Sequence, residues 1–167
     1  MASEEEVDRL MRDLAREAEA GGYHLNPDKE FTRALVKGLL ANRERYGYIS
    51  CPCRLASGNR EDDLDIICPC DYRDPDLSDY GACYCALYVT ADVEAGVRAS
   101  GPVPERRPGP AERARQKEER AAAGHLVGGL KYPVLRCRVC GYLCARDQPP
   151  ETCPICRVPR DRFERFI

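Results

Sequence analysis

The sequence has few large apolar side chains. Trp is absent, Phe occurs three times, and charged residues make up 32% of the 167 residues. A large hydrophobic core is therefore excluded, and the length suits one ordinary domain or two small ones. Small domains bury too little apolar surface to be stable without further support. Something other than the core must help to hold this fold together.

Long apolar runs are also missing. The chain opens with the polar and acidic residues 1–6, which lack the apolar stretch of a secretory signal, and no run is long enough to cross a membrane. The net charge of −2 argues against a general nucleic-acid binder, which needs a basic surface. We therefore expect a cytoplasmic protein with no membrane or nucleic-acid partner.

Cysteine is the residue in excess, with 11 copies. Structural disulfides are disfavoured in a reducing cytosol, so dense cysteines there indicate metal ligands or redox catalysts. Six lie between Cys51 and Cys85 and five between Cys137 and Cys156, and prolines and glycines from Ser100 onward interrupt the segment between the two groups. The sequence predicts a first cysteine-rich domain over 1–97, a linker over 98–130 and a second cysteine-rich domain over 131–167.

The fold class expected is mainly α, because the first 50 residues predict two helices. Ser3 and Glu6 form a capping box for a helix that ends near Ala20, before two glycines. Asn26 and Pro27 predict the start of a second helix, which ends near Tyr46 and Gly47. The apolar positions expected to be buried are Val7, Leu10, Met11, Leu14 and Ala18 in the first helix and Phe31, Leu35, Leu39 and Leu40 in the second. No long regular element is expected between the cysteine pairs, and short β-strands are expected in the second cysteine-rich domain.

The first cysteine group consists of three Cys-x-Cys pairs, namely Cys51 with Cys53, Cys68 with Cys70, and Cys83 with Cys85. A single intervening residue tends to point the two sulfurs apart, so the sulfurs of one pair can serve different roles. Four thiolates satisfy a [4Fe-4S] cluster and leave two for a redox-active pair. Two structural zinc sites, or an electron-transfer cluster without a disulfide, are the alternatives.

The order CPC, CPC, CxC and four surrounding stretches carry a resemblance to a known family. The stretches are GYHLNPDKE, LLANRERYGYISCPCR, DIICPCDYRDPD and YGACYCALYV. Over about residues 5 to 95 the chain resembles the catalytic subunit of ferredoxin:thioredoxin reductase and its archaeal and bacterial relatives. The resemblance implies a small helical iron–sulfur domain with an active disulfide between Cys53 and Cys85. It also implies that the cluster is bound by Cys51, Cys68, Cys70 and Cys83.

The same resemblance implies the activity. Ferredoxin or a similar donor supplies single electrons through the cluster, Cys53 attacks the disulfide of a thioredoxin-like target, and Cys85 resolves the mixed disulfide. Plant-type members carry His at the middle of the third pair, where Tyr84 stands here, and a phenol cannot replace an imidazole near neutral pH. Water, or another group such as His24, would then deliver the proton. Exposed basic residues near the site would dock an acidic ferredoxin, for instance Arg43, Arg45, Arg54 or Arg60.

The second cysteine group has the CxxC and CPxC spacing of a tetrathiolate metal site formed by Cys137, Cys140, Cys153 and Cys156. Residues 131–167 resemble a rubredoxin-like domain of the short rubrerythrin type, which implies one bound iron, although zinc uses the same ligands. Arg157 occupies the place of the second glycine of the motif, so we expect the turn there to be altered. Cys144, outside the motif, is interpreted as a small buried apolar residue.

Together these features predict a disulfide reductase in which the C-terminal iron passes electrons to the cluster or takes them from an external donor. One alternative is a non-enzymatic iron–sulfur and rubredoxin electron carrier or redox sensor. Another is a zinc-dependent interaction module.

Overall fold

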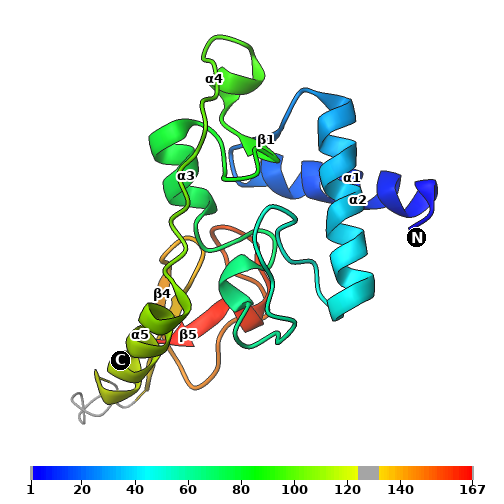
Figure 1. Ribbon diagram of the computed structural model, residues 1–167. Coiled ribbons are helices and arrows are strands. Elements are labelled where there is room, and N and C mark those ends of the chain that lie inside the picture. The colour runs from blue at the N-terminus through cyan, green and yellow to red at the C-terminus, as the bar shows by residue number, and fades with distance from the viewer. Residues whose placement is uncertain (1, 124–131, 167) are drawn as a thin grey trace. The chain divides into compact units, whose positions relative to one another are not determined.

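The computed structural model describes residues 2–123 and 132–166 (Figure 1). The chain forms two compact units, Met1–Glu105 and Arg106–Ile167. Residues 98–105, which the sequence analysis placed in a linker, belong to the first unit. Residues 124–130 of that predicted linker, and residue 131 of the predicted C-terminal domain, lie outside the described residues.

The two helices expected near the N-terminus are confirmed as α1, Glu4–Ala20, and α2, Lys29–Tyr46. Ser3 caps α1 and forms the predicted capping box with Glu6. Gly47 ends α2 in the left-handed conformation, with φ of 83°, which a glycine adopts without steric cost. The start of α2 differs from the prediction, because Asp28 rather than Asn26 is the N-cap and accepts a 3.0 Å hydrogen bond from the Phe31 amide.

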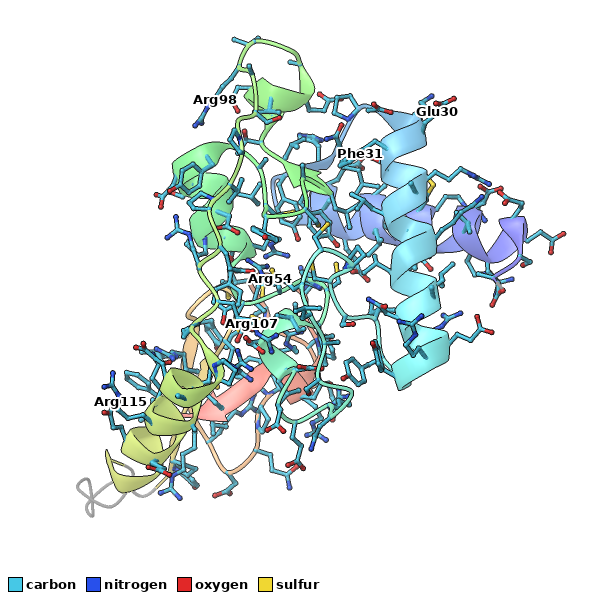
Figure 2. All side chains as sticks on the ribbon, in the orientation of Figure 1. Glu30, Phe31, Arg54, Arg98, Arg107 and Arg115 are labelled. Carbon is cyan, nitrogen blue, oxygen red and sulfur yellow. The ribbon has the colours of Figure 1, made fainter. Side chains whose placement is uncertain are left out.

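Helix α1 packs across α2, and their apolar faces form much of the core of the first unit (Figure 1). The buried apolar residues of the two helices are Val7, Leu14, Ala18, Leu35, Val36, Leu39 and Leu40. The prediction for Phe31, labelled on α2 in Figure 2, is wrong because its side chain is exposed. Thr32 is buried instead, and its hydroxyl donates a 2.9 Å hydrogen bond to the Asn26 carbonyl.

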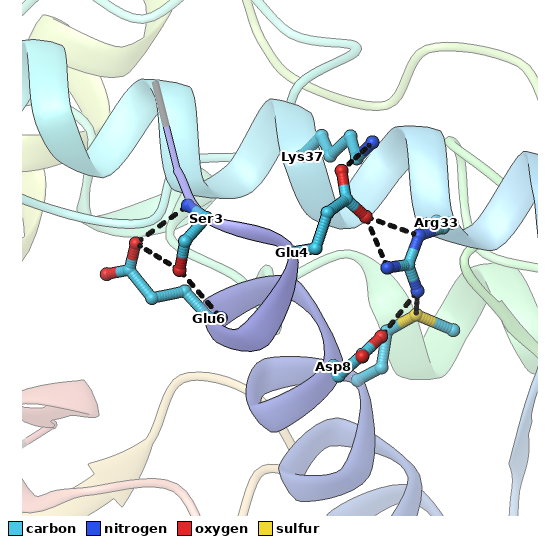
Figure 3. A network of polar contacts seen from close by, with 7 residues as sticks. Ser3, Glu4, Glu6, Asp8, Arg33 and Lys37 are labelled. Atoms are coloured by element: carbon cyan, nitrogen blue, oxygen red, sulfur yellow. Dashed lines mark hydrogen bonds and ion pairs between the residues drawn. The ribbon is translucent and has the colours of Figure 1, made fainter.

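A polar network also joins α1 to α2 (Figure 3). Glu4 forms ion pairs with Lys37, at 2.7 Å, and with Arg33, which also contacts Asp8. Hydrogen bonds from Lys37 and Arg33 lower the pKa of Glu4 to about 2. The network therefore links the helices at the surface above their apolar contact.

The rest of the first unit consists of short elements connected by loops. They are β1 (His24–Leu25), the 3-10 helix η1 (Leu64–Ile66), α3 (Arg73–Tyr80), β2 (Tyr88–Val89) and α4 (Ala91–Glu94). Strands β1 and β2 are antiparallel, with His24 opposite Val89. Helix α3, with eight residues, forms where no long element was expected. It ends at Tyr80, and the C-cap Gly81 adopts the left-handed conformation.

The second unit contains α5 (Pro110–Ala123) and a three-stranded antiparallel sheet. The sheet has the order β4 (Leu143–Ala145), β3 (Val134–Cys137), β5 (Phe163–Arg165), and the 3-10 helix η2 (Arg160–Arg162) precedes β5. The expected fold class, mainly α with short strands near the C-terminal knuckles, is confirmed. None of the helices in the described parts of the chain is long and apolar enough to cross a membrane.

Candidate functional site

Backbone hydrogen bonds join the first two Cys-x-Cys loops. The Cys51 amide donates to the Ile66 carbonyl and the Cys68 amide to the Ile49 carbonyl, both at 2.8 Å, so these loops lie side by side. Within the third loop the Cys83 amide donates to the Tyr88 carbonyl at 2.9 Å. The third pair contacts the first through its thiols, so cysteines from distant segments lie around one centre.

The thiols of this centre contact one another. Cys85 lies within hydrogen-bonding reach of Cys51, Cys53 and Cys83, and its sulfur is 3.7 Å from that of Cys83. Of the six cysteines, Cys53 is exposed and the other five are buried. Cys53 is thus the thiol of this centre that a large substrate can reach.

Three hydrogen-bond donors point at sulfur atoms of the buried cysteines. The Tyr88 amide lies 3.3 Å from the Cys83 sulfur, and the Tyr88 hydroxyl lies 3.6 Å from that of Cys68. Arg54 donates from Nη1 to the Cys70 sulfur at 3.2 Å. Donors of this kind orient thiolate ligands and tune the clusters that they hold. These contacts to Cys68, Cys70 and Cys83 fit an iron–sulfur cluster on buried thiols of this centre.

Burial controls the protonation of the innermost thiols. It raises the pKa of Cys70 to about 12 and that of Cys68 well above its ordinary value. Hydrogen bonds with Cys51 and then Cys85 lower the pKa of Cys53 to about 3. Buried thiols need a compensating positive charge to ionise, which a metal centre supplies, so the site also fits a metal cofactor on electrostatic grounds.

Two arginines of the first unit are buried, and the sequence analysis predicted neither of them to be interior. Arg54 contacts the cysteine centre directly, through the Cys70 sulfur. Arg54 was expected to be an exposed docking residue, but its side chain is 1% exposed, so that prediction is wrong. Arg73 is also buried, with its guanidinium over the rings of Tyr23, at 4.3 Å, and Tyr88, at 5.9 Å. The only sequence signal for either residue is that Arg54 directly follows a CPC pair and Arg73 lies three residues after another.

The second unit brings its four predicted metal-binding cysteines together. The sulfurs of Cys137, Cys140, Cys153 and Cys156 all lie within 4.8 Å of one another. Those of Cys137 and Cys156, and of Cys140 and Cys153, are 3.6 Å apart. Four soft sulfur donors in one group suit iron or zinc. Cys144 lies outside the group, half-buried on β4.

Two matching turns position these four thiols. The Gly141 amide donates to the Cys137 carbonyl at 2.9 Å, and the Arg157 amide donates to the Cys153 carbonyl at 3.0 Å. Gly141 has φ of 78° and Arg157 has φ of 61°. The expectation that Arg157 alters the turn is therefore wrong, because this arginine adopts the left-handed conformation that its glycine counterpart uses.

Charge in the second group is divided unevenly among the thiols. A hydrogen bond with Cys156 lowers the pKa of Cys137 to about 5, whereas burial raises that of Cys140 to about 11. A divalent or trivalent metal ion would stabilise all four as thiolates.

A centre of six cysteines with one exposed thiol, together with a separate four-thiol group, defines a cysteine-based redox and metal-binding protein. Residues 1–103 match the family described as ferredoxin thioredoxin reductase catalytic beta chain, and residues 136–164 match the rubredoxin-like domain of rubrerythrin. The chain belongs to the ferredoxin thioredoxin reductase catalytic beta chain family, here joined to a rubredoxin-like domain, as the sequence predicted. Comparison with curated proteins found no match.

Family membership makes the chain an iron–sulfur oxidoreductase of the disulfide reductase type, with a second metal-binding domain.

Proposed function

We propose that the chain takes single electrons from ferredoxin or a similar donor and uses them to reduce the disulfide of a thioredoxin-like protein. The proposal assigns Cys53 and Cys85 as the redox-active pair and Cys51, Cys68, Cys70 and Cys83 as ligands of a [4Fe-4S] cluster. When bound, the cluster would hold one electron beside the pair, which matters because the donor delivers electrons singly and a disulfide takes two. We place this activity in the cytoplasm, where thiols are kept reduced.

The observation that carries the proposal is the contrast between Cys53 and Cys85. Cys53 is exposed, whereas Cys85 is buried behind it within hydrogen-bonding reach. An accessible thiolate with a buried partner in contact is the arrangement that thiol–disulfide exchange requires of a nucleophile and a resolving cysteine.

In the first step the Cys53 thiolate attacks one sulfur of the target disulfide. A mixed disulfide forms, the target S–S bond breaks, and the departing target thiolate takes up a proton. In the second step the Cys85 thiol gives up its proton as its sulfur attacks Cys53. The Cys53–Cys85 disulfide forms, the Cys53–target S–S bond breaks, and the second target thiolate leaves and is protonated. Each turnover thus transfers two electrons to the target, whose two thiolates take up one proton from Cys85 and one from water, and two one-electron deliveries restore the reduced pair.

We further propose that Cys137, Cys140, Cys153 and Cys156 hold one iron, and that this iron relays electrons to the first centre. The close grouping of the four sulfurs supports the iron site, and its occurrence in the same chain as a disulfide reductase centre supports the relay. Cys153→Ser in the full chain tests the relay. We expect donor-driven turnover to fall while reduction of the target by chemically reduced enzyme is retained, and unchanged donor-driven turnover would reject the relay.

Cys53→Ser tests the main proposal, with Cys144→Ser as the matched control because Cys144 belongs neither to the centre of six cysteines nor to the four-thiol group. We expect Cys53→Ser to abolish disulfide reduction but to keep about five iron and four sulfide per chain, and we expect the control to match the wild type. Loss of the cluster in Cys53→Ser would instead make Cys53 a ligand. Retained reduction would show that Cys53 is not the nucleophile, and a wild type that does not reduce the target would favour a non-enzymatic carrier or sensor. Zinc in place of iron would reject both cofactor assignments.

A further inference from the structure

Arg54 places a fixed positive charge inside the cysteine centre. Its side chain is 1% exposed, and the guanidinium carbon lies 4.7 Å from the ring centroid of Tyr72 and 4.4 Å from that of Tyr84 (Figure 2). Guanidinium groups stack favourably on aromatic rings, and a planar group in contact with two rings has little freedom to reorient. Arg54 is therefore held in one position beside the third Cys-x-Cys pair.

The N–H groups of Arg54 are divided between sulfur and carboxylate. Nη1 donates to the Cys70 sulfur at 3.2 Å, while Nε and Nη2 each lie 2.9 Å from Oε1 of Glu105. The buried carboxylate of Asp76 is 3.9 Å from Nη2. Arg54 thus connects a proposed cluster ligand to Glu105 in the last segment of the first unit.

Arg54 also lies next to the proposed redox pair, because it directly follows Cys53 in the chain and its guanidinium stacks on Tyr84, the residue before Cys85. Reduction of a disulfide to thiols and thiolates puts negative charge on sulfur, and a nearby cation in a poorly solvated interior favours that form. A disulfide whose reduced form is stabilised has a higher reduction potential. Glu105 acts in the opposite direction, because its negative charge lies against the same guanidinium.

We propose that Arg54 is a positioning residue that raises the reduction potential of the Cys53–Cys85 pair, and that Glu105 moderates this effect. The inference rests on the proposed function, because it requires the Cys53 thiolate and the Cys85 thiol to form one S–S bond with loss of two electrons and the Cys85 proton. By favouring the dithiol, Arg54 makes the pair easier for the donor to reduce and a milder reductant toward the target.

The test measures the reduction potential of the pair in the full cluster-loaded chain. The protein is equilibrated with mixtures of reduced and oxidised dithiothreitol and alkylated, and the modified Cys53 and Cys85 peptides are quantified by mass spectrometry. The variants are Arg54→Gln, Arg54→Lys and Glu105→Gln. Arg12→Gln on the exposed face of α1 and Glu94→Gln on α4 remove the same charges away from these contacts. Iron and sulfide content are determined for every sample.

We expect Arg54→Gln to lower the reduced-to-oxidised ratio about tenfold at a fixed redox buffer, equivalent to a shift of about 30 mV to more negative potential. Arg54→Lys keeps the charge and should shift the ratio less, whereas Glu105→Gln should shift it in the opposite direction. A merely structural role for Arg54 would not produce shifts of opposite sign. The two control variants should match the wild type.

Equal potentials in Arg54→Gln, Glu105→Gln and the wild type would overturn the inference while leaving the proposed function intact. If Arg54→Gln fails to fold or to bind the cluster, Glu105→Gln decides alone, with a positive shift supporting the inference and an unchanged potential rejecting it. Absence of any dithiol–disulfide couple at Cys53 and Cys85 in the wild type would reject the proposed function, and this inference with it.

Discussion

The side-chain amide of Asn26 donates a 3.0 Å hydrogen bond to the carbonyl oxygen of Ala86, immediately after the third Cys-x-Cys pair. The Asn26 backbone amide donates to the neighbouring Leu87 carbonyl at 2.9 Å, and its side-chain oxygen accepts from the Asp28 amide at 3.0 Å. Asn26 therefore fixes the loop of Cys83 and Cys85 to the start of α2.

Asn26→Ala removes the two side-chain hydrogen bonds of this residue. We expect the first unit to lose about 1–2 kcal/mol of unfolding free energy, because each bond contributes roughly 1 kcal/mol. Urea unfolding followed by circular dichroism measures the change. Asn59→Ala is the control, since the Asn59 side chain accepts its hydrogen bond within an exposed loop. Equal urea midpoints of unfolding for Asn26→Ala and Asn59→Ala would contradict a specific role for Asn26.

Arg157→Gly should stabilise the second unit. A non-glycine residue in the left-handed conformation costs about 1–2 kcal/mol of folding free energy, and glycine removes this cost. Glycine also makes the unfolded chain more flexible, which cancels roughly 0.5–1 kcal/mol of the stabilisation. A net increase of about 0.5–1 kcal/mol is expected in thermal unfolding of the metal-loaded protein. Gly141→Ala, at the matching turn with no neighbouring atoms within 4 Å of the added methyl group, should have the opposite effect. Destabilisation by Arg157→Gly would show that the arginine side chain has a role of its own.

The Glu4 network should make the stability of the first unit depend on pH in the acidic range. The pKa of Glu4 is lowered from 4.5 to about 2 in the folded chain, by hydrogen bonds from Lys37 and Arg33. A carboxylate with a lowered folded-state pKa stabilises the fold above its unfolded pKa, and this contribution is lost as the pH falls from about 4.5 through about 2. The melting temperature of the wild type should therefore exceed that of Glu4→Gln at pH 6, and the difference should shrink toward pH 2. Glu5→Gln, in the same exposed turn, should follow the wild type throughout.

Metal removal should unfold the C-terminal sheet. Among the described residues of this unit, the buried aliphatic ones are Leu135, Val139 and Val158, so the four thiolate–metal bonds must supply much of its stability. Amides of β3 and β5 should lose protection from hydrogen exchange when a chelator removes the metal or when Cys156→Ala removes a ligand. Cys144→Ala, which alters a cysteine outside the group, should keep that protection. Retained protection without metal would show that the sheet folds independently of it.

Leu55 should contribute to recognition of the protein target. Its side chain is 92% exposed two residues after the proposed nucleophile Cys53, and an exposed leucine there can be covered by a bound partner. Leu55→Ser should raise KM for a thioredoxin-like substrate about threefold to tenfold and leave reduction of a small aromatic disulfide unchanged. An equal effect on both substrates would indicate a change in the centre itself. Val97→Ser, another exposed apolar residue of the same unit, is the control.

The sequence determined those features that depend on neighbouring residues. The capping box of Ser3 and Glu6 and the stop at Gly47 are local hydrogen-bonding and backbone preferences, and the structure confirms both helices. The Cys-x-Cys and CxxC spacings likewise define the two cysteine groups, and the order of the pairs together with the surrounding stretches carries the resemblance to the family.

Tertiary contacts decided the rest, because burial and charge pairing join residues that are far apart in the chain. The sequence predicted Arg54 to be an exposed docking residue, but contacts with Tyr72, Tyr84 and Glu105 place it inside the centre. Phe31 falls on the apolar stripe of its helix, yet nothing packs over it closely enough to bury it. Arg157 shows the same limit within a turn, since the hydrogen bond to Cys153 holds the arginine in a conformation that its residue type disfavours.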